Sequence, residues 1–280
     1  MATPPLPSTP RGACDCHVHI YEHGYPLAPT ATFKPPHAPV SAYRQVQQAL
    51  GLERVVLVQP LGYGFDNRCL LDALAQLGSD AARGIAIVPP EVSDDELARL
   101  HHAGVRGVRY MMLAGAGGPL TWDTLEAMAA RIAPLGWTIN LQLDGRELPQ
   151  RKALIDRLPG KVVIDHTGKF MEPVPPSDAA FKALLAVLDQ GERWVKLSAP
   201  YETSRVGPPH YDDVAVLAKA LVEAHPDRCL WASNWPHPNR VQVPADADLL
   251  GLLGEWVGDE GVRERVLVGN AVGVYGFPDR

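Results

Sequence analysis

The chain alternates eight times between a short apolar run that favours β-structure and a longer amphipathic run rich in Ala and Leu. Nearly continuous apolar strands that are followed by helices are typical of a parallel sheet buried on both faces. Eight such units within about 250 residues predict a single-domain α/β fold, the (β/α)8 TIM barrel. The alternative is a doubly wound open sheet, but no Gly-rich phosphate loop follows the first strand.

The expected elements cover the chain from residue 13 onward. The strands are expected at Ala13–Ile20, Arg54–Pro60, Gly84–Pro89, Val105–Met111, Trp137–Leu143, Lys161–His166, Trp194–Ser198 and Arg228–Ser233. The helices are expected at Ala42–Leu50, Asn67–Leu77, Ser93–Ala103, Thr121–Ala133, Glu147–Leu158, Ser177–Leu188, Tyr211–Ala224, Leu249–Val257 and Glu260–Leu267. The barrel domain therefore spans residues 13–280, and the Pro-rich residues 1–12 are expected to form a flexible leader.

Composition narrows the range of partners and the cellular compartment. The formal net charge is -6, and no cluster of Lys and Arg marks a nucleic-acid site. No apolar run approaches the roughly 20 residues that cross a bilayer. Cys14 and Cys16 are too close in one strand to pair usefully, and Cys69 and Cys229 are far away in the sequence. This cysteine usage predicts a reducing, cytoplasmic setting. The oligomeric state has no signal in the sequence.

Polar side chains gather at the predicted strand ends, where TIM barrels place their catalytic groups. His17 and His19 are two residues apart on the first strand and should point the same way, with Asp15 below them. Two inward histidines without partners are costly, which favours a functional role over an ordinary structural one. His166 closes the sixth strand and Asn234 the eighth. The predicted catalytic residues are His17, His19, His166 and Asn234; Asp15 is not among them.

Other residues near the strand ends are expected to bind a ligand. Arginine is suited to bidentate recognition of a carboxylate, so a small acid is the expected partner. Lys196, on the seventh strand, needs a partner or a lowered pKa and is equally compatible with a structural role. The loop 24–40 is unusually long and is a candidate for function. The predicted substrate-binding residues are Gln59, Arg109, Gln142, Tyr201, Arg205 and His237.

Three short motifs resemble the amidohydrolase superfamily over nearly the whole chain. They are HVH at 17–19, IDH at 164–166 and NWPH at 234–237. VRGVR at 105–109, DHTGKF at 165–170 and YETSR at 201–205 resemble the branch of that superfamily that acts on lactones without a metal. The resemblance implies a barrel enzyme that needs no cofactor and acts on the lactone of a sugar acid or a related carboxylate.

Asn234 departs from the pattern of the superfamily, whose hydrolytic members carry Asp at this position. An amide cannot take up a proton near neutral pH, and it is a poorer zinc ligand than a carboxylate. Either the chain uses a nucleophile other than activated water, such as a hydroxyl of the substrate, or Asn234 is an engineered replacement. The resemblance favours the first explanation, with isomerisation of a 1,5-lactone to a 1,4-lactone. The segment after Arg109, MMLAGAGGPL, lacks arginine and favours an acid with one free carboxylate over pyrone dicarboxylate.

Three alternatives remain open from the sequence. The first is lactone hydrolysis, of a pyrone or muconolactone type, with water activated by His166 or His237. The second is a zinc-dependent hydrolase or decarboxylase with His17, His19 and His166 as ligands. The third is a barrel that binds a sugar acid but has lost its catalytic base.

Overall fold

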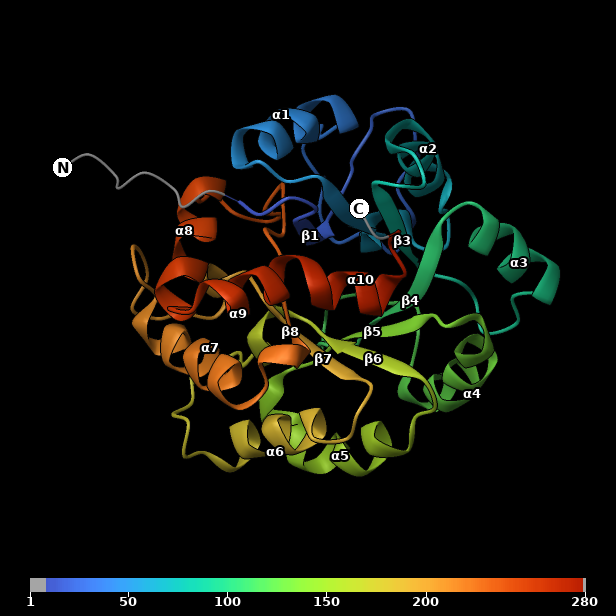
Figure 1. Ribbon diagram of the computed structural model, residues 1–280. Coiled ribbons are helices and arrows are strands. Elements are labelled where there is room, and N and C mark those ends of the chain that lie inside the picture. The colour runs from blue at the N-terminus through green and yellow to red at the C-terminus, as the bar shows by residue number, and fades with distance from the viewer. Residues whose placement is uncertain (1–8, 279–280) are drawn as a thin grey trace.

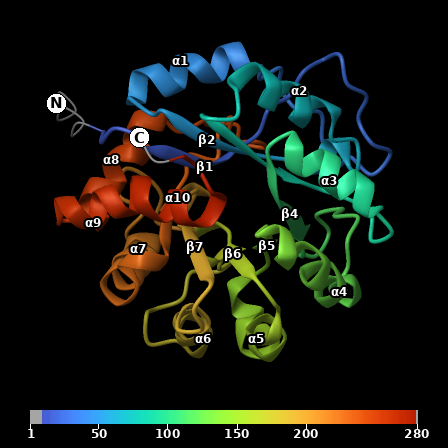
Figure 2. The same cartoon turned by 45° about the vertical axis from the view of Figure 1, so that its right-hand side comes forward.

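The computed structural model describes residues 9–278. Eight parallel strands form one sheet in chain order, and helices surround it (Figures 1 and 2). The predicted single-domain (β/α)8 barrel is confirmed. The strands are β1 (Cys14–Val18), β2 (Arg54–Val58), β3 (Ala82–Ala86), β4 (Val105–Met111), β5 (Thr138–Gln142), β6 (Lys161–Ile164), β7 (Arg193–Leu197) and β8 (Cys229–Trp231).

A helix follows each strand and covers the outside of the sheet. These helices are α1 (Val40–Leu50), α2 (Arg68–Leu77), α3 (Asp94–His102), α4 (Trp122–Ile132), α5 (Leu148–Arg157), α6 (Ala179–Leu188), α7 (Asp212–Ala224) and α8 (Asp246–Trp256). The last predicted helix, 260–267, is too short. In the structure α9 (Glu260–Glu264) continues through a π-helical turn (Arg265–Gly269) into α10 (Asn270–Tyr275). Gly269 and Gly273 lower the helix propensity of this segment, but burial against the barrel outweighs the low propensity.

α10 crosses the N-terminal end of the barrel (Figure 1). Its apolar side chains Ala271, Val274 and Tyr275 share a buried cluster with Cys14, Cys16, Val56 and Leu230 from the strands. Basic side chains from the strands bind the carbonyls at its C-terminal end: Arg83 donates to Gly276 O (2.7 Å) and Lys161 to Gly273 O (2.9 Å). Cations are favourable at a helix C-terminus. This end of the barrel is therefore closed, and a pocket can open only at the other.

Backbone hydrogen bonds of the predicted catalytic residues His17, His19 and Asn234 close the barrel between β8 and β1. The Asn234 N–H donates to the His17 carbonyl (3.0 Å), and the His19 N–H donates to the Trp235 carbonyl (2.8 Å). A single parallel bridge joins Val18 to Trp235. The backbone of the seam thus fixes Asn234 beside the two histidines of β1.

An irregularity in β1 corrects the predicted place of Asp15. The register between β1 and β2 shifts between Asp15 and Val18. Asp15 consequently turns away from the histidines and accepts hydrogen bonds from Ser233 N (2.9 Å) and Tyr43 Oη (3.2 Å). A bulge of this kind places two consecutive side chains out of alternation, which simple period-two counting cannot foresee. His17 and His19 still point the same way, as predicted.

The remaining predictions concern the chain ends and the cysteines. The predicted leader, 1–12, lies mostly outside the described residues; within it, Thr9 Oγ1 donates to the Leu50 carbonyl (2.6 Å). No helix among residues 9–278 is long and apolar enough to cross a membrane. All four cysteines are free and buried, although Cys14 Sγ and Cys16 Sγ lie 3.7 Å apart. The absence of disulfides agrees with the sequence analysis, and the cytoplasmic compartment stays a prediction.

Candidate active site

A pocket of about 390 Å³ opens at the C-terminal ends of the strands. The long loop after β1 contributes Thr32 and Phe33 to its wall, as its length led us to expect. The other polar and charged side chains that line it come from both sides of the barrel: His19, Tyr21, Arg109, Gln142, His166, Lys169, Glu202, Asn234, Asn239 and Arg240.

The two histidines of β1 form a hydrogen-bonded chain with defined tautomers. His19 Nδ1 lies 2.7 Å from the Val58 carbonyl and must donate to it, so His19 Nε2 carries no proton. His17 Nε2 lies 3.2 Å from that nitrogen and therefore donates to it. His17 Nδ1 in turn accepts from the Lys196 ammonium at 3.1 Å. The Nε2–H of His17, which donates to His19, is therefore made more acidic by the lysine that donates to Nδ1 on the other side of the ring.

Burial keeps the histidine cluster neutral. It lowers the pKa of His17 well below the ordinary value, and the Lys196 charge lowers it further. Burial and the Arg109 charge lower the pKa of His19 to about 3. Burial also lowers the pKa of His166, and the neighbouring His17 lowers it further. At neutral pH these rings act as N–H donors or acceptors, not as cations.

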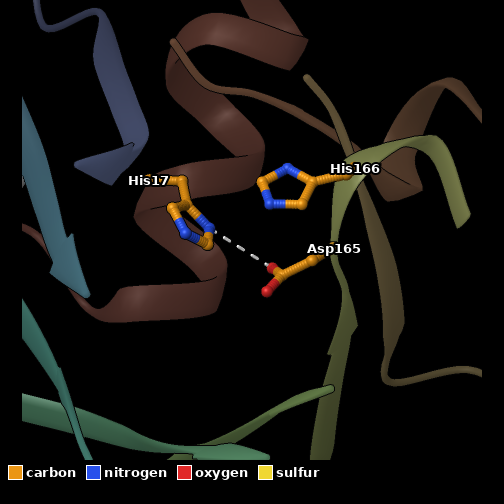
Figure 3. A group of neighbouring side chains, drawn as sticks. All are labelled: His17, Asp165 and His166. Atoms are coloured by element: carbon orange, nitrogen blue, oxygen red, sulfur yellow. Dashed lines mark ion pairs between the residues drawn. The ribbon is translucent and has the colours of Figure 1, made fainter. Parts of the chain in front are cut away.

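Lys196 and Asp165 form a fully buried ion pair beneath the histidines. Lys196 Nζ lies 2.9 Å from Asp165 Oδ1, and that oxygen lies 3.5 Å from His17 Nδ1 (Figure 3). Burial alone would raise the pKa of Asp165, but Lys196, His166 and Arg109 together outweigh it and hold this pKa below the usual range. The floor of the site therefore contains an ammonium group paired with a carboxylate, and Lys196 has the partner that its position required.

The donors of the site fit a metal ion poorly. His17, Asp165 and His166 are the one group of three potential ligands found among residues 9–278, with donor atoms within 4.8 Å of one another (Figure 3). This group differs from the predicted trio because Asp165 takes the place of His19. The Lys196 ammonium already contacts two of the three donors, His17 Nδ1 and Asp165 Oδ1. A divalent cation would have to bind against that charge.

At the end of β8, a chain of hydrogen bonds fixes the orientation of the Asn234 amide. Asn234 Nδ2 donates to Tyr201 Oη (2.9 Å) and lies 3.4 Å from Glu202 Oε1. Tyr201 Oη lies 2.8 Å from His237 Nδ1, and His237 Nε2 lies 3.0 Å from Asp246 Oδ1. The Asp246 carboxylate requires a proton on His237 Nε2, so Tyr201 donates to Nδ1. Both N–H groups of the amide are engaged, and its oxygen is the atom left to accept from a ligand.

Lys169 and Glu202 form an ion pair in the pocket wall that the sequence analysis missed. Lys169 follows β6 and Glu202 lies in the turn after β7; their side chains are only 7% and 13% exposed. Burial lowers the pKa of Lys169 to about 7, helped by the Arg240 charge, and the Asp165 charge opposes this. Lys169 lies in the DHTGKF motif and Glu202 in the YETSR motif, so the resemblance of these motifs to the lactone branch was the one sequence feature that could have marked them as functional. Charged loop residues are usually exposed, so nothing else marked them.

Arg109 is a buried cation without a carboxylate partner. Its guanidinium donates to the Gln59 carbonyl (2.9 Å) and to Gln142 Oε1 (3.2 Å), both neutral. Among residues 9–278 no ion pair joins it to a carboxylate, although the charge of the buried Asp165 acts on it from a greater distance. Burial lowers its pKa, but a guanidinium remains charged at any pH the fold tolerates. An unpaired cation in a pocket wall favours an anionic ligand.

Four predicted binding residues do not line the pocket: Gln59, Tyr201, Arg205 and His237. The Arg205 side chain is 69% exposed and pairs with Glu172 (3.2 Å), because Asp213 of α7 accepts from the Arg205 N–H (2.7 Å) and holds the loop outward. The Gln59 side chain donates to nearby backbone carbonyls, so only its own carbonyl serves the site, by holding Arg109. His237 lies behind Tyr201. Arg240, which was not predicted, lines the opening instead.

Comparison with known proteins places the chain in a family. The family model for amidohydrolases matches residues 14–277. D-Galactarolactone isomerase of Agrobacterium fabrum is 34% identical over 274 residues, which cover 96% of this chain and 92% of the relative. The 2-pyrone-4,6-dicarboxylate hydrolase of Comamonas testosteroni is also 34% identical, with 95% and 90% covered.

A third relative and a solved structure agree with this placement. The 4-sulfomuconolactone hydrolase of Rhizobium radiobacter is 35% identical, with 95% of this chain and 91% of the relative covered. An apo crystal structure from Agrobacterium tumefaciens superimposes with a TM-score of 0.92 at 32% identity and covers 98% of this chain and 99% of the other. The chain is therefore an enzyme of the amidohydrolase family.

Proposed function

We propose that this enzyme isomerises the lactone of a sugar acid, converting a 1,5-lactone into a 1,4-lactone without a metal. The observation that carries the proposal is Asn234, because the strand end that would hold a base for water holds an amide instead. Among the relatives, one is named as a lactone isomerase and others as lactone hydrolases, at similar identity. The choice between the two reactions therefore depends on the site.

The charges of the pocket support a small acid as the substrate. Arg109 would bind the free carboxylate, since the groups that its guanidinium contacts directly, the Gln59 carbonyl and Gln142 Oε1, are both neutral. Deeper in the pocket, the Gln142 amide would exchange hydrogen bonds with hydroxyl groups of the substrate, and the Asn234 oxygen would accept one. Arg240, at the opening of the pocket, would bind the substrate in place of Arg205, which was predicted to do so.

The lactone carbonyl would lie against the histidine cluster. His166, which lines the pocket, would supply an N–H group to the developing oxyanion. The His17 N–H, which is bonded to His19 Nε2 in the free enzyme, would turn to the oxyanion when substrate binds, and the Lys196 ammonium behind His17 would stabilise the negative charge. The Asn234 oxygen would accept from the attacking hydroxyl and orient it. Because nucleophile and carbonyl belong to one molecule, proximity supplies much of the rate acceleration.

Hydrolysis is the second candidate, and the named hydrolases among the relatives favour it. It requires a base that activates water. The two bases considered from the sequence are weak candidates, because burial lowers the pKa of His166 and Tyr201 occupies His237 Nδ1. The zinc-dependent alternative predicts that metal removal abolishes turnover. Metal independence predicts equal rates before and after dialysis against a chelator, with the metal content measured in both samples.

Proton NMR of the enzyme with a panel of aldaric-acid lactones, run beside a pH-indicator assay, tests the proposal. Isomerisation predicts a new lactone and no release of acid. Stoichiometric acid release would establish hydrolysis instead, and no turnover of any lactone would favour a binding protein.

A further inference from the structure

We propose that Glu202 is the acid–base residue of this site, with Lys169 holding it in the ionised state. The inference rests on the proposed lactone isomerisation and adds the group that moves the proton. It places the catalytic carboxylate in the turn after β7, not at the end of β8, where hydrolytic members of the family carry it.

Glu202 is the one carboxylate among the described residues that line the pocket. The other polar groups there exchange protons poorly near neutral pH. Asn234 is an amide and Arg109 a guanidinium. Burial lowers the pKa of His166 well below its ordinary value and raises the pKa of Tyr21. His19 has a pKa of about 3 and donates its only N–H to Val58. A site that must remove and return one hydroxyl proton is therefore left with the Glu202–Lys169 pair.

The position of Glu202 next to Asn234 supports the same role. Glu202 Oε1 lies 3.4 Å from Asn234 Nδ2, while Oε2 contacts Lys169 Nζ. A carboxylate at position 234 would oppose ionisation of Glu202, whereas the amide donates a hydrogen bond to it. The same amide presents its oxygen to the attacking hydroxyl. Asn234 and Glu202 thus divide between them the orienting and the proton-accepting roles.

Isomerisation needs one proton to move and none to be gained or lost. The substrate hydroxyl forms a C–O bond to the lactone carbonyl, and its proton passes to the Glu202 carboxylate. The tetrahedral intermediate then collapses with cleavage of the ring C–O bond. The Glu202 carboxylic acid returns the proton to the departing ring oxygen, which becomes the new hydroxyl. Glu202 ends as a carboxylate, still paired with Lys169.

The cations around Glu202 favour its ionised form, whereas the carboxylates of Asp165 and Asp246, which act on its neighbours Lys169 and Tyr201, oppose it. Lys169 follows β6, Arg109 lies on β4 and Arg240 follows β8, while Asn234 and Tyr201 are neutral neighbours. The rate should therefore fall on the acid side as Glu202 gains a proton. Removing the Lys169 charge should move this fall to higher pH, which a purely structural ion pair would not do.

Glu202→Gln tests the proposal, with Glu172→Gln as a matched control. Glu172 is an exposed carboxylate that pairs with Arg205 and Arg146 at the surface. We expect Glu202→Gln to lower kcat by about 10²–10⁴-fold with little change in KM, and to lose the acid limb of the pH profile. Glu202→Asp should regain part of the rate, and Glu172→Gln should keep it. Circular dichroism establishes that each variant is folded.

The outcomes separate this inference from the proposed function. If the wild-type enzyme isomerises and Glu202→Gln keeps its kcat and its acid limb, the role of Glu202 is refuted and the isomerase stands. If the wild-type enzyme hydrolyses instead, the isomerase is refuted, and loss of the acid limb in Glu202→Gln still establishes Glu202 as the base for water. If no lactone is turned over, both proposals fail.

Discussion

Replacing Asn234 with Asp should destabilise this enzyme in a pH-dependent way. The new carboxylate would lie about as close to Glu202 Oε1 as Asn234 Nδ2 does, 3.4 Å, with both side chains largely buried. Two unit charges at that separation repel by about 5 kcal/mol at an effective dielectric constant of about 20. Lys169 offsets part of this repulsion, which leaves roughly 2–4 kcal/mol.

The sign of the pH dependence follows from the shift in the pKa. Repulsion raises the folded-state pKa of one carboxyl of the pair above its unfolded value of about 4. Such a group destabilises the fold above pH 4, and the penalty grows until the pH passes the raised pKa. We therefore expect Asn234→Asp to lose little stability at pH 4.5 and the full amount at pH 8.

Urea unfolding at both pH values checks this expectation in the wild type, in each single variant and in Asn234→Asp with Glu202→Gln. The double variant should recover the stability lost at pH 8, because only one carboxylate remains. Equal losses at both pH values, or losses that simply add in the double variant, would refute the proposed electrostatic coupling.

Four further predictions follow from the site. Arg109→Met should raise KM for a carboxylate lactone by about 10–100-fold, while Arg205→Met, a matched change at the surface, should alter KM less than about 2-fold in the same steady-state assay. Lys196→Met should cost about 3–5 kcal/mol of unfolding free energy at pH 8 in urea titration. That cost should shrink on acidification, because the lowered pKa of Asp165 gives stability that is lost as the pH falls through it. His17→Ala should abolish turnover while circular dichroism shows an intact fold; full activity would contradict the oxyanion role. Dialysis against a chelator should leave kcat unchanged in a direct rate assay, and a loss restored by added zinc would contradict metal independence.

The sequence predicts the barrel well because each strand carries its own apolar signal and each helix its own periodicity. It also predicts which strand ends meet, since in a TIM barrel all strand ends share one edge. His17, His19, His166 and Asn234 are brought together for that reason. The backbone bonds that close the barrel between β8 and β1 make the contact between Asn234 and His17 a consequence of topology.

The rest of the site depends on contacts that no local pattern encodes. Asp15 leaves the predicted face because of a bulge in β1. Arg205 is turned away by Asp213, a residue of the next helix. Lys169 and Glu202 come from different loops and are buried only because they neutralise each other across the pocket. Loop conformation is set by such long-range partners, so the strand-end residues could be predicted and the loop residues could not.

The most direct test of lactone isomerisation is to run the reaction in water enriched in ¹⁸O and to analyse the products by mass spectrometry. Attack by a hydroxyl of the substrate predicts a new 1,4-lactone with unchanged mass and no labelled acid beyond that of an enzyme-free control. An acid product that gains one ¹⁸O atom at the rate of turnover would show that the enzyme activates water, and would contradict the isomerase.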